Sequence, residues 1–92
     1  MTYTVVLRRE PEGGYTILVP ALPEIVSYGK DLEAAQRMAA DAMRCAILGR
    51  RDVGEEVPEE GPLVAIPEAE RTGDLLICRL APAPLEETPA YA

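Results

Sequence analysis

Residues 29–49, GKDLEAAQRMAADAMRCAILG, carry the strongest structural signal in the chain. Residues 32–48 contain no Gly, Pro, Val or Thr, and six of them are alanine, a composition that favours a helix. Asp31 is a suitable N-cap because its carboxylate accepts hydrogen bonds from the first free N–H groups. Gly49 is predicted to end the helix in the left-handed conformation, with Arg50 and Arg51 at the negative end of its dipole.

The predicted helix is amphipathic, with small and apolar side chains along one stripe and charged ones mostly outside it. Small residues on the stripe would let the helix lie close to a sheet. Arg37 and Asp41 are spaced for an i,i+4 ion pair on the exposed side. The stripe comprises Leu32, Ala35, Ala39, Ala42, Met43 and Ala46.

Four segments have the alternation or composition of β-strands. Residues 2–9 and 15–19 flank a turn with two glycines, which predicts an antiparallel hairpin. The corner Pro20-Ala21-Leu22-Pro23 then leads to a short strand at 25–28. After the helix, the apolar run at 74–80 lies between Gly73 and Pro82 and predicts a fourth strand.

These elements predict an α+β fold, a two-layer β-β-β-α-β domain over residues 1–80. An antiparallel meander of three strands is covered on one face by the helix, and the fourth strand is expected beside the first. Residues 50–73 form an acidic, proline-rich loop, and residues 81–92 are expected to be a mobile C-terminal tail.

The excess of negative charge lies in the part of the chain that follows the helix. The 92 residues carry a net charge of −7. Seven basic and six acidic residues lie up to Arg51, whereas two basic and ten acidic residues follow it. This balance argues against sequence-independent nucleic-acid binding, which depends on Lys and Arg, and favours a basic protein partner.

The composition also argues against an enzyme. There is no histidine, which excludes His-based catalysis and His-metal sites. Asp31, Glu33 and Asp41 suit helix capping and surface positions better than a metal site, so no cofactor and no metal are expected. Cys45 and Cys78 are far apart and are interpreted as buried apolar residues of a cytoplasmic protein. No signal peptide and no apolar run of membrane-spanning length is present.

Three groups of residues resemble the HicB-like antitoxin family. They are Gly13-Gly14-Tyr15, the corner Pro20-Ala21-Leu22-Pro23-Glu24, and the helix start Gly29-Lys30-Asp31-Leu32-Glu33-Ala34-Ala35, followed later by Asp41-Ala42. They occur in the family's order and spacing over residues 3–48. Glu24 and Ile25 stand where that family has Gly and a small residue or Cys, and Asp31 stands where it has a capping hydroxyl.

The resemblance implies a partial ribonuclease-H-like core and the silencing of a small basic ribonuclease toxin of the HicA type. Complete antitoxins of this family usually append a helix-turn-helix or ribbon-helix-helix domain that binds operator DNA. The residues after the helix are acidic and proline-rich with one strand, and no recognition helix is evident. Direct DNA binding is therefore not expected.

Two surfaces are candidates for contact with such a partner, and each has a simpler interpretation. The corner and the following strand can form a partner surface or only a rigid turn. The acidic loop can mimic phosphate or serve as a solvated linker. The candidate residues are Leu22, Pro23, Glu24, Tyr28, Glu55, Glu56, Glu59 and Glu60.

Two further alternatives concern assembly and function. A domain with so thin a core would gain from a homodimer, for which the strand at 74–80 offers an edge. The main alternative to an antitoxin is a solitary regulatory domain that binds a small ligand between helix and sheet. A degenerate nuclease is a third hypothesis.

Overall fold

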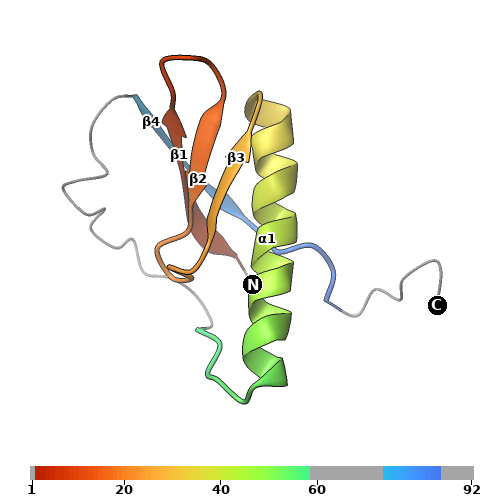
Figure 1. Ribbon diagram of the computed structural model, residues 1–92. Coiled ribbons are helices and arrows are strands. Elements are labelled where there is room, and N and C mark those ends of the chain that lie inside the picture. Colours follow the sequence, from red (N-terminus) through yellow and green to blue (C-terminus); the bar gives the residue numbers. More distant parts are fainter. Residues whose placement is uncertain (1, 59–73, 86–92) are drawn as a thin grey trace.

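The computed structural model describes residues 2–58 and 74–85, and one helix packs on a four-stranded sheet (Figure 1). The sheet order is β3-β2-β1-β4, and all neighbouring strands are antiparallel. The predicted α+β fold, with the fourth strand beside the first, is confirmed. The elements are β1 (Tyr3–Arg9), β2 (Tyr15–Leu18), β3 (Val26–Gly29), α1 (Leu32–Asp52) and β4 (Leu75–Leu80).

The core lies between α1 and one face of the sheet. From β1, alternate side chains point into it, and Tyr3, Val5 and Leu7 are all buried there. The helix contributes a row of residues spaced by four that are fully buried, namely Ala35, Ala39, Met43 and Ile47. Leu32 belongs to the predicted apolar stripe but is exposed, whereas Ile47 was not included in that stripe and is buried.

Gly29 is the point of closest approach between helix and sheet. It is buried at the end of β3, two residues before the N-cap Asp31, whose carboxylate accepts a hydrogen bond of 2.8 Å from the Ala34 N–H. A Cβ atom at Gly29 would lie 2.4 Å from both the N and the Cα of Ala35. The absence of a side chain therefore lets the first turn of α1 rest on β3.

The prediction that the helix ends at Gly49 is wrong. The helix continues to Asp52, and the residue with positive φ is Gly54, at 77°. A glycine inside a helix costs only about 1 kcal/mol, and the arginines at 50 and 51 are good helix formers. Gly49 is therefore accommodated, and the helix ends where Gly54 takes the left-handed conformation.

The predicted ion pair between Arg37 and Asp41 is not formed, because Arg37 pairs with Glu33 instead. Arg37 Nη1 lies 3.3 Å from Glu33 Oε1, one turn towards the N-terminus. An acidic residue placed before a basic one at i,i+4 is the more favourable orientation in the field of the helix dipole. Both side chains are exposed.

Residues 81–85, which the sequence places in a mobile tail, lie in contact with α1. The Ala83 N–H donates to the Ala40 carbonyl at 3.0 Å, and Arg44 Nε donates to the Pro84 carbonyl at 3.1 Å. Leu85 packs against the core. The rest of the predicted tail, residues 86–92, lies outside the described residues.

Candidate partner-binding surface

The corner between β2 and β3 places two predicted residues at the surface and one in the core. Two turns shape it, since the Leu22 N–H donates to the Val19 carbonyl at 2.9 Å and the Ile25 N–H to the Leu22 carbonyl at 3.0 Å. Leu22 is 0% exposed and fills the core, so its side chain is not available to a partner. Pro23 and Glu24 are exposed.

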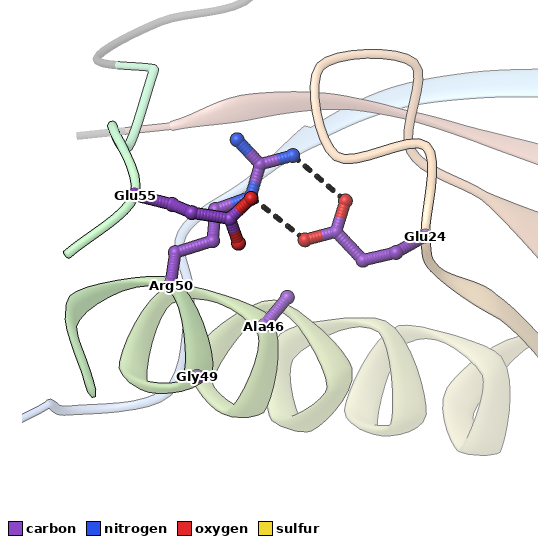
Figure 2. A pocket seen from close by; sticks show the side chains of 5 residues that line it. All are labelled: Glu24, Ala46, Gly49, Arg50 and Glu55. Atoms are coloured by element: carbon purple, nitrogen blue, oxygen red, sulfur yellow. Dashed lines mark hydrogen bonds and ion pairs between the residues drawn. The ribbon is translucent and has the colours of Figure 1, made fainter. Parts of the chain in front are cut away.

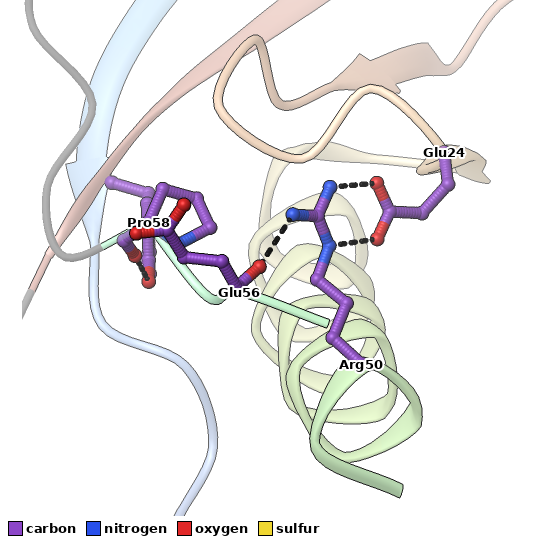
Figure 3. Close-up of polar contacts among 5 residues, drawn as sticks. Glu24, Arg50, Glu56 and Pro58 are labelled. Carbon is purple, nitrogen blue, oxygen red and sulfur yellow. Dashed lines mark hydrogen bonds and ion pairs between the residues drawn. The ribbon is translucent and has the colours of Figure 1, made fainter. Parts of the chain in front are cut away.

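Arg50 connects this corner with the end of α1 (Figure 3). Its Nε donates to Glu24 Oε2 and its Nη2 to Glu24 Oε1, both at 2.8 Å. Its Nη1 donates to the main-chain carbonyl of Glu56 at 2.9 Å. One guanidinium therefore joins the corner, the last turn of the helix and the segment that follows it. Parallel hydrogen bonds between Arg and a carboxylate fix geometry as well as charge.

From the sequence, Arg50 is predicted only as a cation at the end of the helix, and its ion pair with Glu24 is not predicted. These two residues are 26 positions apart. We call the surface formed by Pro23, Glu24, Arg50, Glu55 and Glu56 the acidic corner.

The acidic corner contains one carboxylate that is paired with Arg50 and two that are not. Hydrogen bonds from Arg50 hold the pKa of Glu24 below its ordinary value of 4.5. In return, the hydrogen bond to Glu24 raises the pKa of the Arg50 guanidinium. Glu24 is thus ionised and already paired. Glu55 and Glu56 are exposed, and neither carboxylate is among the hydrogen-bond acceptors of Arg50.

The surface around this ion pair is hollowed. One open hollow, of about 350 Å³, is lined by residues of the corner, of α1 and of the segment after it, namely Glu24, Ala46, Gly49, Arg50 and Glu55. In Figure 2, Arg50 and Glu55 lie together on one side and Glu24 faces them from the other. A second, of about 360 Å³, runs between β3 and α1 over Ile25, Val26 and Ala42, Cys45 and Ala46. Among the described side chains, every buried nitrogen and oxygen atom has a hydrogen-bond partner.

The remaining predicted residues are elsewhere. Tyr28 is 52% exposed, and the strand register places it on the sheet face opposite α1. Its hydroxyl donates to the Gly13 carbonyl at 3.0 Å, at the turn between β1 and β2. Tyr28 is therefore not part of the acidic corner. Glu59 and Glu60 lie outside the described residues.

The acidic residues and cysteines that were considered for catalysis or redox chemistry either serve in capping, ion pairing and packing or are exposed at the surface. Asp31 caps α1 and Glu33 pairs with Arg37. In residues 2–58 and 74–85, no group of three or more His, Cys, Asp or Glu side chains is arranged to hold a metal ion. Cys45 is exposed rather than buried as expected, and burial raises the pKa of the half-buried Cys78 thiol. Within the same residues, no helix is apolar enough over the required length to span a membrane.

The ion pair gives the fold a predicted pH dependence. Because the pKa of Glu24 is lowered in the folded state, its contribution to stability is present above pH 4.5 and is lost as the pH falls through the folded pKa. Glu24→Gln should lower the free energy of unfolding slightly at neutral pH and have a smaller effect in acid. Urea unfolding at pH 7 and in acid measures both.

The matched control for this prediction is Glu56→Gln. Arg50 binds the main-chain carbonyl of Glu56, so this variant keeps the contact and should leave stability at neutral pH unchanged. Equal destabilisation by Glu24→Gln at both pH values would show that the charge of Glu24 is not what stabilises the corner.

Known proteins resemble this chain in sequence, although no protein-family model matches it. It is 36% identical to antitoxin HicB 1 of Photorhabdus laumondii over 63 residues, which are 68% of this chain and 41% of that protein. It is 32% identical to a UPF0150 protein of Thermoplasma acidophilum over 60 residues, which are 65% of this chain and 87% of that protein. The match thus spans less than half of the antitoxin but most of the UPF0150 protein. Together with the α+β fold, these matches show that the chain belongs to the HicB-like (UPF0150) family.

Proposed function

We propose that this protein acts as an antitoxin, binding and neutralising a small basic ribonuclease toxin of the HicA type in the cytoplasm. The observation that carries the proposal is the match to a protein named as a HicB antitoxin. The acidic corner and the net charge of −7 support it, since both suit a partner whose surface is shaped to bind RNA. The chemistry would then belong to the partner, and this chain would not be an enzyme.

The proposed mechanism combines steering with occlusion. Glu55 and Glu56 are exposed at the end of α1 and would attract a cationic surface before contact. Glu24 is held in one orientation by Arg50, so the corner loses little conformational entropy when a partner docks. Pro23 and the hollow beside Ala46 would receive apolar or long side chains. An acidic surface seated on the RNA-binding groove excludes the substrate.

The proposal is tested by recovering and assaying the partner. The tagged protein is incubated with lysate of its native organism at low salt, and the bound proteins are eluted with rising salt. We expect a small basic protein that cleaves RNA alone and does not when this chain is added back. Failure to recover a ribonuclease, or undiminished cleavage after recombination, would contradict the proposed function.

A charge reversal tests the acidic corner itself. The double variant Glu55→Lys/Glu56→Lys should slow association with the recovered toxin by about tenfold or more at low salt and reduce its salt dependence, because steering is lost. Association rates measured by surface plasmon resonance at several salt concentrations give both values.

The control for this reversal is Glu12→Lys/Asp41→Lys, which changes the net charge equally at exposed sites outside the acidic corner. Its association rate should fall much less. Equal losses for both variants would attribute the effect to net charge alone.

Two other aspects of the proposal concern assembly and ligands. We propose a homodimer, and direct DNA binding is not part of the function proposed. The alternative of a solitary regulatory domain rests on the hollow between β3 and α1. This alternative would be favoured if a metabolite raised the melting temperature of the protein and no toxin were recovered from the lysate.

A further inference from the structure

The outer edge of β4 has backbone groups that can pair with another strand. The Arg9 N–H donates to the Asp74 carbonyl at 2.9 Å, which makes these two residues a hydrogen-bonded pair of the antiparallel ladder. Because such pairs alternate along a ladder, Leu76 and Cys78 direct their backbone groups towards β1. Ile77 between them directs its N–H and C=O away from the sheet. Within residues 2–58 and 74–85, no hydrogen bond from another element reaches Ile77.

The side chains of this edge are apolar and half-exposed on both faces of the sheet. Ile77 is 50% exposed on the face opposite α1, and Leu76 is 47% exposed on the face that α1 covers. The helix packs mainly over β3 and β2, which leaves Leu76 and Cys78 beside it only partly covered. A long apolar edge strand without an internal proline or lysine is a site of strand pairing.

We propose that β4 pairs with β4 of a second copy, antiparallel and centred on Ile77, so that two four-stranded sheets become one continuous sheet. This inference specifies the homodimer proposed above and is independent of toxin binding. A dyad at Ile77 pairs its outward N–H and C=O with those of the partner's Ile77. On the other face, Leu76 then lies opposite the partner's Cys78. Both half-exposed side chains, Leu76 and Ile77, gain contacts.

The charge distribution favours a second copy over a basic partner at this edge. Arg79 is the one charged residue of β4, and it holds Thr4 and Thr2 through its guanidinium at 3.2 Å. A cationic toxin would gain nothing from an apolar strand with an arginine. With the dyad at Ile77, the two Arg79 residues lie at opposite ends of the new ladder and do not face each other.

The other edge of the sheet is less suited to this pairing. β3 has four residues against six for β4 and follows the corner containing Pro20 and Pro23. Its outward side is next to the acidic corner, where two copies with like charge would repel each other. Val26 is 72% exposed there and lies in the same cross-strand row as Ile77. Val26 therefore serves as the matched control position.

The first test measures the dimer and its dependence on Ile77. Ile77→Lys places two ammonium groups opposite each other at the dyad and should weaken the dimer at least about tenfold in sedimentation equilibrium. Val26→Lys makes the same change on the other edge and should leave the dissociation constant within about twofold of the wild-type value. Circular dichroism establishes that both variants are folded.

The second test reads the register by cross-linking. In a Cys45→Ser background, Leu76→Cys faces the partner's Cys78 at a Cα separation of about 4.5 Å, which a disulfide can bridge. Mild oxidation should give a covalent dimer, and adding Cys78→Ser should abolish it. A dimer of Cys78 alone, without the substitution at Leu76, would overturn the register centred on Ile77.

The outcomes separate this inference from the proposed function. A wild-type dimer that tolerates Ile77→Lys and forms no cross-link would place the interface elsewhere and overturn the inference while keeping the homodimer. A wild-type protein that is monomeric would overturn both the β4 interface and the homodimer. Toxin binding is measured independently and should weaken with salt, whereas a dimer of two acidic chains should strengthen as salt screens their repulsion.

Discussion

Gly29→Ala is expected to destabilise the fold by about 3 kcal/mol, a large part of the roughly 5–15 kcal/mol that stabilises a small domain. The added methyl group would lie 2.4 Å from the backbone N and Cα of Ala35. Backbone atoms cannot move aside as a flexible side chain can, so the start of α1 must lift from β3. Urea unfolding of the variant and wild-type proteins measures the difference in the free energy of unfolding.

The matched control is Gly49→Ala, which makes the same chemical change within α1. Apart from its chain neighbours and the nearby backbone of α1 itself, no heavy atom lies within 4 Å of a Cβ at Gly49, and its φ is not positive. Alanine is favoured over glycine in a helix by about 0.5–1 kcal/mol, so this variant should be more stable than the wild type. A neutral Gly29→Ala would mean that α1 does not rest on β3 at this point.

Gly29 and Gly49 illustrate the difference between features that local sequence patterns predict and features that depend on tertiary packing. Local patterns identify the elements: alternation for β1 and β2, and alanine-rich composition for α1. A meander of three strands leaves β1 at one edge of the sheet, and β4 was correctly predicted to add there, beside β1. The local signal at Gly49 was misleading, because a helix tolerates a single glycine and Gly54 provides a better end. The contact of Gly29 with Ala35 depends on how helix and strand meet, which no local pattern specifies.

The candidate surface shows the same limit more strongly. Glu24, Glu55 and Glu56 were selected from the sequence because they lie at a corner and in an acidic run. Their relation to one another depends on Arg50, whose contact with Glu24 exists only after α1 has packed on the sheet. Tyr28 was selected with them because it is close in sequence, but alternation along β3 turns it to the other face.

The second large effect is expected at Leu22, whose replacement by alanine should cost about 3 kcal/mol. The side chain is 0% exposed and packs in the core cluster at a corner held by two main-chain hydrogen bonds. Those hydrogen bonds keep the corner from collapsing into the space left by the missing atoms, so a cavity remains. Urea unfolding of Leu22→Ala against the wild type gives the value.

Leu22 and its neighbour Pro23 separate a core residue from a surface residue. Pro23→Ala removes an exposed side chain and should cost at most about 1 kcal/mol, mainly by increasing the freedom of the unfolded chain. If the acidic corner binds the toxin, Pro23→Ala should weaken affinity although the protein stays stable. Leu22→Ala should weaken binding only in proportion to the fraction that is unfolded. A Leu22→Ala protein that is as stable as the wild type but loses affinity would return Leu22 to the binding surface and contradict its place in the core.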